Sequence, residues 1–131
     1  MRRLIDHIDL RVRDRRAATV FYDGLLSVLG AVKRDGPQYS TWSIPADDPN
    51  AERVDNFGIV QDDRLVAGSV RIAFRAPSRD AVDAVAKILP SIGARNVEMD
   101  DGIYGDAFYG VFFEDPDGNR LEVCVDNTPM V

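Results

Sequence analysis

Four positions that could act together appear when the chain is compared with itself. At an offset of 64 residues, His7 aligns with Arg71 and Gly58 aligns with Glu122. An imidazole can bind a metal ion or transfer a proton near neutral pH, and a carboxylate can do the same. A guanidinium can hold a carboxylate or phosphate through two parallel hydrogen bonds. The four positions therefore predict one site built from two equivalent parts of the chain, with glycine leaving one place without a side chain.

The internal repeat rests on six identities and on a shared order of elements. Each copy runs from an alternating strand, through a capping Asp or Ser, to a helical stretch and a glycine. The identical pairs are Ile8 and Ile72, Arg11 and Arg75, Arg15 and Arg79, Ala17 and Ala81, Leu25 and Leu89, and Ser27 and Ser91. We therefore expect a single domain over residues 1–131, made of a module at about 1–62 and a module at about 66–131.

Alternating apolar residues predict the strands that carry two of the four positions. From Leu4 to Val12, four apolar residues, Leu4, Ile8, Leu10 and Val12, share one parity, so His7 is expected on the face opposite the main core. Over residues 69–76 the same alternation places Arg71 on the corresponding face. Shorter runs predict further strands over residues 39–44 and 54–60.

Helix signals follow each of these strands. Asp14 and Ser78 are expected N-caps, because their side-chain oxygens can accept hydrogen bonds from free backbone N–H groups at a helix start. Gly30 is expected to end the first helix. Pro90 lacks an N–H group and is expected to kink or end the second helix near Leu89. A two-layer α+β arrangement follows, in which the helices cover one face of a sheet and leave the other face open.

A hairpin is predicted close to the C-terminus. The segment from Asp115 to Gly118 reads Asp-Pro-Asp-Gly, which matches the preferences of a type I turn. It joins predicted strands at 108–114 and 119–125. In the second of these strands, alternation places Glu122 and Cys124 on the face opposite the core.

Other candidate residues have ordinary explanations. We expect Trp42, Phe112 and Phe113 to fill the space between the layers rather than to stack on a ligand. Cys124 has no base nearby in the sequence that would activate it, and is expected to be an inert apolar filler. The glycine-containing segment 100–106 fits either a mobile lid or a plain connecting loop.

Composition excludes several classes of function. The chain has 22 acidic and 16 basic residues, a net charge of −6 and a pI of about 4.7, so nucleic acid is not an expected partner. No apolar run approaches the roughly 20 residues of a membrane-spanning helix. A signal peptide is not visible, and we expect a cytoplasmic protein. Cys124 is the only cysteine, which rules out an internal disulfide.

Three segments resemble the vicinal-oxygen-chelate superfamily, which includes glyoxalase I, extradiol dioxygenases, fosfomycin-resistance enzymes and bleomycin-resistance proteins. They are IDHI at residues 5–8, RIAFRAPS at 71–78 and YGVFFEDPDGNRLE at 109–122. The resemblance implies an α+β fold in which paired βαβββ modules form a cupped mixed sheet around a cleft, with helices on the outer face. Because many relatives are dimeric, it also implies a homodimer.

The resemblance assigns roles to the aligned residues. His7 matches the first-strand histidine ligand and Glu122 the last-strand carboxylate ligand of metal-dependent members. Arg71 stands where such members have a histidine, and Gly58 is the counterpart of Glu122. Tyr109 matches an aromatic position that could contact a substrate. A catalytic divalent ion usually has three protein ligands, so we expect no cofactor, or a weakly held Mn, Fe, Ni or Zn ion.

Two functions remain open at this point. The first is a glyoxalase-, bleomycin-resistance- or dioxygenase-like protein that binds a small oxygenated molecule in the cleft without a metal, with Gly58 and Arg71 as ligand-binding positions. In that case Arg71 either pairs with Glu122 or binds an anionic group, and His7, Glu122 and Tyr109 are the candidate catalytic groups. The second is a metal-dependent lyase or dioxygenase of the same superfamily that uses His7 and Glu122 as ligands.

Overall fold

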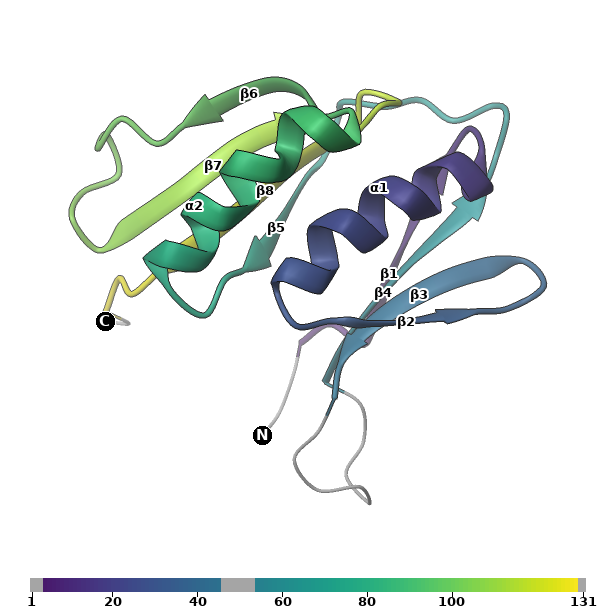
Figure 1. The fold of residues 1–131 in the computed structure, drawn as a ribbon, viewed down its shortest axis with the longest axis horizontal. Coiled ribbons are helices and arrows are strands. Elements are labelled where there is room, and N and C mark those ends of the chain that lie inside the picture. The colour runs from purple at the N-terminus through teal and green to yellow at the C-terminus, as the bar shows by residue number, and fades with distance from the viewer. Residues whose placement is uncertain (1–3, 46–53, 130–131) are drawn as a thin grey trace. The chain divides into compact units, whose positions relative to one another are not determined.

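The chain folds into two compact units, Met1–Leu65 and Val66–Val131. The computed structural model describes residues 4–45 and 54–129, apart from the side chains of residues 54 and 55. In each unit one strand is followed by a helix and then by three strands (Figure 1). This is the βαβββ order expected for both modules.

The first unit is a four-stranded mixed sheet with one helix. Its elements are β1 (His7–Val12), α1 (Arg15–Val28), β2 (Val32–Asp35), β3 (Tyr39–Ile44) and β4 (Val54–Gln61). The strand order is β1-β4-β3-β2, with β1 parallel to β4. Helix α1 is amphipathic, and its apolar side lies against β3 and β4. The buried core between the two layers includes Phe21, Tyr22, Leu25, Trp42, Phe57 and Ile59.

The second unit repeats this architecture. Its elements are β5 (Arg71–Arg75), α2 (Arg79–Ile88), the 3₁₀ turn η1 (Leu89–Ile92), β6 (Arg95–Met99), β7 (Phe108–Glu114) and β8 (Arg120–Asp126). The strand order is β5-β8-β7-β6, again with the first strand parallel to the last. Helix α2 packs against β7 and β8 on one face of the sheet. The buried core here includes Val82, Val85, Leu89, Val111, Phe113, Leu121 and Val123.

The two sheets have the same strand register at the offset of 64 residues, as the internal repeat predicts. The paired residues are His7 with Asn56 and Asp9 with Gly58 in the first sheet, and Arg71 with Arg120 and Ala73 with Glu122 in the second. Since these pairs come from parallel strands far apart in the sequence, the agreement is a property of the fold and not of local sequence alone.

The predicted helix caps are confirmed at equivalent places. The Asp14 side chain accepts a hydrogen bond from the backbone N–H of Ala17 at 3.1 Å, and Ser78 accepts one from Ala81 at 3.1 Å. Gly30 follows the first helix with φ +86°, a conformation that glycine adopts without strain. Each cap fixes the point at which the chain leaves the first strand and turns over the sheet.

Pro90 ends the second helix as predicted. Helix α2 stops at Ile88, and the 3₁₀ turn that follows contains the proline near its start. A proline cannot donate the backbone hydrogen bond that the next α-helical turn requires. The tighter turn keeps Leu89 buried while the chain changes direction towards β6.

The hairpin between β7 and β8 is confirmed and is held together by a buried acid. Asp115 is 1% exposed, and its Oδ1 accepts hydrogen bonds from the backbone N–H groups of Asp117 and Asn119 at 2.9 and 2.8 Å. The amide nitrogen of the Asn119 side chain donates to Oδ2 at 2.9 Å. These bonds fix the register that places Glu122 on the open face.

The predicted first strands are too long at their N-terminal ends. Strand β1 starts at His7, and Leu4 is 99% exposed; β5 starts at Arg71, and Val70 is 69% exposed. In each unit the ladder with the parallel partner begins at that first residue. The apolar residues before His7 and Arg71 continue the alternation but have no neighbouring strand to pair with. The alternating pattern alone therefore overestimates the length of each strand.

The described part of the chain contains no helix with the length and apolar character needed to cross a bilayer.

Candidate functional site

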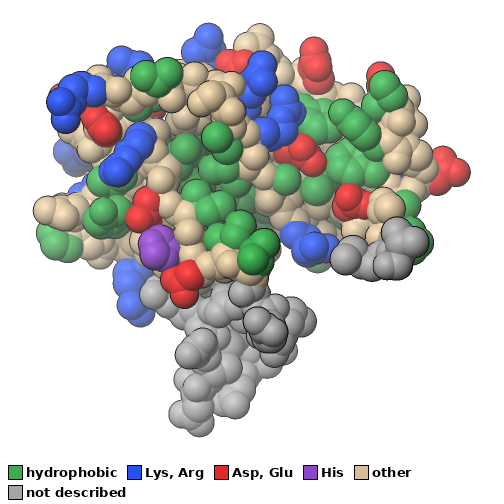
Figure 2. Space-filling model, turned by 180° about the vertical axis from the view of Figure 1, so that it is seen from behind, with side chains coloured by type: hydrophobic (Ala, Val, Ile, Leu, Met, Phe, Trp, Pro, Cys, Tyr) green, Lys and Arg blue, Asp and Glu red, His purple; other side chains and the backbone are tan. Residues whose placement is uncertain are grey.

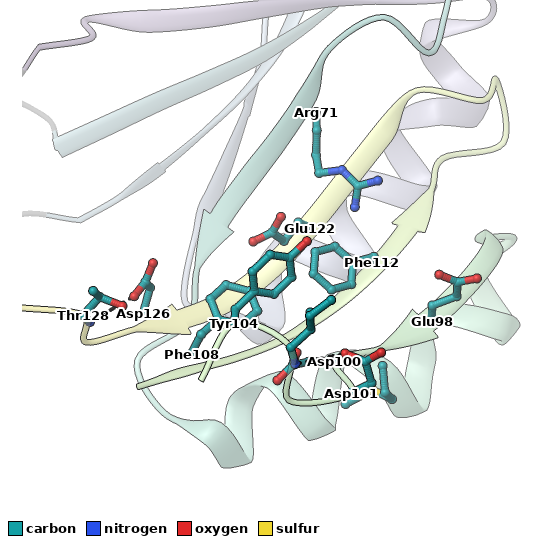
Figure 3. A pocket seen from close by; sticks show the side chains of 12 residues that line it. Arg71, Glu98, Asp100, Asp101, Tyr104, Phe108, Phe112, Glu122, Asp126 and Thr128 are labelled. Carbon is teal, nitrogen blue, oxygen red and sulfur yellow. Dashed lines mark hydrogen bonds between the residues drawn. The ribbon is translucent and has the colours of Figure 1, made fainter. Parts of the chain in front are cut away.

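The open face of the second sheet carries a hollow of about 800 Å³. It lies on the side opposite α2, where β5, β7 and β8 meet the segment after β6 (Figure 3). The lining residues are Arg71, Glu98, Met99, Asp100, Asp101, Ile103, Tyr104, Phe108, Phe112, Glu122, Asp126 and Thr128. Arg71 and Glu122, two of the predicted site residues, therefore belong to one concave surface.

Three aromatic rings form the floor of this hollow. Phe108 and Phe112 are stacked, with ring centroids 6.1 Å apart and an interplanar angle of 18°. Tyr104 meets Phe108 edge-on at 5.3 Å and lies 6.3 Å from Phe112. Phe112 was expected to pack between the layers, but its parity in β7 places it on the open face with Phe108. The apolar floor is therefore larger than the sequence indicated.

Gly110 makes room for the two stacked rings. It lies between Phe108 and Phe112 on the same face of β7, and a Cβ atom there would be 3.0 Å from Cζ of Phe108. The same atom would lie 3.1 Å from Cβ of Cys124 and from the carbonyl oxygen of Val123. A side chain at position 110 would therefore collide with the floor and with strand β8.

Arg71 lies on this floor rather than in an ion pair. Its guanidinium carbon is 4.9 Å from the centroid of the Phe112 ring, a cation–π contact. Glu122 is in register with both Ala73 and Phe112 and is half-buried. An ion pair between Arg71 and Glu122 was one of two alternatives for this arginine, and no ion pair among the described residues includes either side chain.

The segment between β6 and β7 forms one wall of the hollow. Asp100 accepts a hydrogen bond from the N–H of Gly102, and Asp101 accepts one from Ile103, both at 3.1 Å. The N–H of Asp100 donates to the carbonyl of Gly110 at 2.9 Å, which ties the segment to β7. The wall carries Tyr104 over the floor and leaves its side chain 64% exposed.

Tyr109 lies on the other face of β7. Its hydroxyl forms a short hydrogen bond with Asp83 of α2, and the Arg79 guanidinium carbon is 5.0 Å from its ring centroid. The hydrogen bond to Asp83 is the main cause that raises the pKa of Tyr109. The predicted substrate contact thus has no place in the hollow, because Tyr109 and Phe108 are neighbours in a strand and point to opposite faces.

His7 lies on the open face of the first sheet between two carboxylates. Its Nδ1 is 2.8 Å from Oδ1 of Asp6, and its Nε2 is 3.5 Å from Oδ2 of Asp9. The histidine side chain is half exposed, and Figure 2 shows the single histidine at the surface with acidic groups beside it. The hydrogen bond to Asp6, followed by the charge of Asp9, raises the pKa of His7 above its ordinary value of 6.5.

Asp9 is a candidate site residue that the sequence analysis missed. A Cβ atom on Gly58 would lie 3.0 Å from Oδ1 of Asp9, so the aspartate carboxylate occupies the space that glycine leaves. The equivalent pair in the second sheet is Ala73 and Glu122, in which the acid is on the other strand. Each unit therefore presents one carboxylate at this paired position. The sequence signal that could have identified it is the place of Asp9 two residues after His7, on a strand whose partner has Gly58 at the paired position.

We expect the raised pKa of His7 to add a pH-dependent term to stability. Because the folded pKa lies above that of the unfolded chain, the stabilisation is complete below about pH 6.5 and is lost as the pH rises through the folded pKa. NMR titration of the single imidazole should give a midpoint above 6.5 that falls in Asp6→Asn. An unchanged midpoint in that variant would contradict the assignment.

We also expect Cys124 to be nearly inert. Burial, and then the hydrogen bond and charge of Glu122, raise the pKa of Cys124 to about 11. About one thiol in a thousand is then ionised at pH 8, and alkylation by iodoacetamide should be roughly a hundredfold slower than in the unfolded chain. Glu122→Gln should speed the reaction, while Glu98→Gln is the matched control. Equal rates in these two variants would argue against the Glu122 contact.

The described residues do not form a metal site with the usual number of ligands. No group of three His, Cys, Asp or Glu side chains in residues 4–45 and 56–129 is placed to hold an ion. In the first unit, Nε2 of His7 and Oδ2 of Asp9 are two donors, and a catalytic divalent site usually has three from the protein. In the second unit, Glu122 shares the hollow with the positive charge of Arg71.

Comparisons with known proteins identify the family. The model of the Glyoxalase/Bleomycin resistance protein/Dioxygenase superfamily matches residues 4–123. A search of curated proteins gives no match.

Solved structures share the fold at low sequence identity. A glyoxalase/bleomycin resistance protein from Albidiferax ferrireducens T118 is 24% identical, with a TM-score of 0.76 over 93% of this chain and 98% of that chain. The fosfomycin resistance protein FosX from Mesorhizobium loti is 18% identical, with a TM-score of 0.70 over 98% and 96%. A mutant of FosX from Listeria monocytogenes, complexed with Mn(II) and 1S,2S-dihydroxypropylphosphonic acid, is 19% identical, with a TM-score of 0.68 over 98% and 94%.

With the paired βαβββ units and the family match over nearly its whole length, this chain belongs to the glyoxalase/bleomycin resistance protein/dioxygenase superfamily.

Proposed function

We propose that the chain binds a small oxygenated molecule in the hollow of the second unit and does so without a resident metal ion. The observation that carries this proposal is the hollow itself, whose volume of about 800 Å³ is in the range of small-molecule sites. Its aromatic floor supplies apolar contact area. Glu122 supplies a polar group that can orient a ligand, and Arg71 lies beside it on the aromatic floor.

The choice of a metal-independent site follows from the side chains present. Arg71 brings a positive charge to the same hollow as Glu122, and two like charges a few ångströms apart repel each other. A divalent ion held by Glu122 would therefore lose part of its binding free energy. The position equivalent to Glu122 in the first unit is Gly58, which offers no ligand atom.

The alternative is a metal-dependent lyase or dioxygenase with His7 and Glu122 as ligands. One observation favours it: Asp6 holds Nδ1 of His7, as a carboxylate commonly orients a metal-binding imidazole. This leaves Nε2 directed towards Asp9. The FosX mutant from Listeria monocytogenes, which shares the fold, is complexed with Mn(II).

Metal analysis and ligand binding separate the two functions. The purified chain is analysed for Mn, Fe, Ni and Zn, and ¹⁵N-labelled protein is titrated with small oxygenated compounds of positive, neutral and negative charge, with and without a chelator. We expect less than one tightly held ion per chain, and ligand shifts at Tyr104, Phe108 and Phe112 that the chelator does not change. One ion per chain, together with ligand binding that requires it, would favour the alternative.

The variant Arg71→His adds a sharper comparison. If arginine has taken the place of a metal ligand, the variant should bind one of the four ions more tightly than the native chain, seen as a larger rise in melting temperature. Arg75→His, on the same strand, is the matched control. No gain at position 71 would count against the view that arginine replaced a ligand there.

A further inference from the structure

The hollow of the second unit carries an excess of negative charge. Its lining contains five carboxylates and one guanidinium, a formal balance of −4, from Glu98, Asp100, Asp101, Glu122 and Asp126 against Arg71. None of these six groups forms an ion pair with another described residue. Arg75, outside the lining, acts on Asp126 through its charge, but the lining itself keeps a negative excess, and a concave surface with an excess of one sign attracts ligands of the opposite sign.

The floor of the hollow favours cations for a second, independent reason. The face of an aromatic ring is negative, so cations bind over it. Phe112 already holds such a group, because the planar guanidinium of Arg71 lies 4.9 Å from its centroid. Phe108 and Tyr104 extend the same surface, and the Tyr104 side chain is largely exposed.

We propose that the ligand of this hollow is a planar organic cation, such as a conjugated ring system that carries a protonated amine or amidine. The inference rests on the proposed function and names the class of ligand. The plane of the ligand would lie on the aromatic floor, and its charge would face the surrounding carboxylates. Two separate features of the lining, its charge balance and its ring faces, select for the same chemistry.

Arg71 then has a role opposite to that of an anion receptor. Its guanidinium is a planar cation on an aromatic ring, close in kind to the ligand proposed for the same surface. A ligand cation would compete with it for the ring face and would be repelled by its charge. Removing the arginine should therefore tighten cation binding, whereas it would abolish binding of an acid.

Three naphthalene probes of similar shape test the sign of the charge. Protonated 1-naphthylmethylamine, neutral 1-naphthalenemethanol and anionic 1-naphthoate are titrated into the ¹⁵N-labelled full chain, and the signals of Tyr104 and Phe112 are followed. We expect the amine to bind about tenfold more tightly than the alcohol, and the acid most weakly. Added salt should weaken the binding of the amine alone, because salt screens the attraction between its charge and the carboxylates.

Matched variants locate the effect in the hollow. Glu122→Gln should weaken amine binding about fivefold and leave the alcohol unchanged. Asp80→Asn, at the start of α2 on the other side of the sheet, makes the same charge change and should have no effect. Arg71→Ala should tighten amine binding about threefold or more. Amide spectra of each variant confirm that it is folded before the titration.

The outcomes separate this inference from the proposed function. Alcohol binding as tight as amine binding, or tightest binding by the acid, at the same signals would overturn the cation assignment and leave a small-molecule site in the hollow. Weaker amine binding in Arg71→Ala would also overturn it. If no probe moves the Tyr104 and Phe112 signals, both the inference and the proposed site in the hollow fail.

Discussion

Replacing Asp115 with alanine is expected to lower the free energy of unfolding by about 3 kcal/mol, because the hairpin loses a buried acceptor of three hydrogen bonds. Two of the three donors belong to Asn119, which is 7% exposed and has little access to water. A buried donor left without a partner loses its hydration without compensation. The measurement is urea unfolding of the full chain, followed by far-UV circular dichroism.

Asp101→Ala is the control for this prediction. Asp101 also accepts a backbone hydrogen bond from the residue two positions later, but its side chain is exposed and water can replace the lost acceptor. We expect a loss of less than about 1 kcal/mol there. Similar losses at both positions would show that burial of the hairpin turn contributes little.

Placing a side chain at position 110 is expected to disturb both stability and ligand binding. In Gly110→Ala the new Cβ meets the Phe108 ring, Cβ of Cys124 and a backbone oxygen, all at 3.0–3.1 Å. Two of these contacts belong to the neighbouring strand, which cannot move without breaking its ladder, so we expect a cost of about 1–3 kcal/mol. The Phe108 ring should turn away from Phe112 and weaken probe binding in the hollow.

Gly58→Ala provides the matched comparison in the first sheet. Its nearest atoms are Oδ1 of Asp9 at 3.0 Å and a methyl group of Thr41 at 3.2 Å, and both are the ends of side chains that can rotate. We expect a smaller loss of stability there, with a change in the NMR titration of His7 as Asp9 moves. A loss equal to that of Gly110→Ala would mean that the Phe108 ring and β8 yield as easily as these side chains.

Much of the fold could be predicted because its signals are local or repeated. The caps at Asp14 and Ser78 depend on residues three positions away, and the end of α2 follows from the covalent chemistry of Pro90. The internal repeat then allowed the positions predicted in one unit to be transferred to the other. It correctly set Gly58 and Glu122 at the same paired position, which no local pattern could do.

The candidate site was less predictable because it depends on what lies across each strand. Arg71 and Glu122 do line one hollow, but the stacking of Arg71 on Phe112 needed the register of three strands. Tyr109 was assigned by resemblance alone, and its parity in β7 turns it towards Asp83. The joint site of His7 with these residues stays a prediction.

The paired positions of Asp9 with Gly58 and of Ala73 with Glu122 bear on how such duplicated chains diverge. In an alignment of the two halves, Gly58 stands opposite Glu122 and Asp9 stands opposite Ala73, so the two positions look like unrelated differences. In each sheet, however, the two positions are paired across neighbouring strands, so each pair carries one acid. A carboxylate can thus stand on either of two paired strands and occupy nearly the same place on the sheet, and a comparison of the halves by strand pairing shows a correspondence that column-by-column comparison hides.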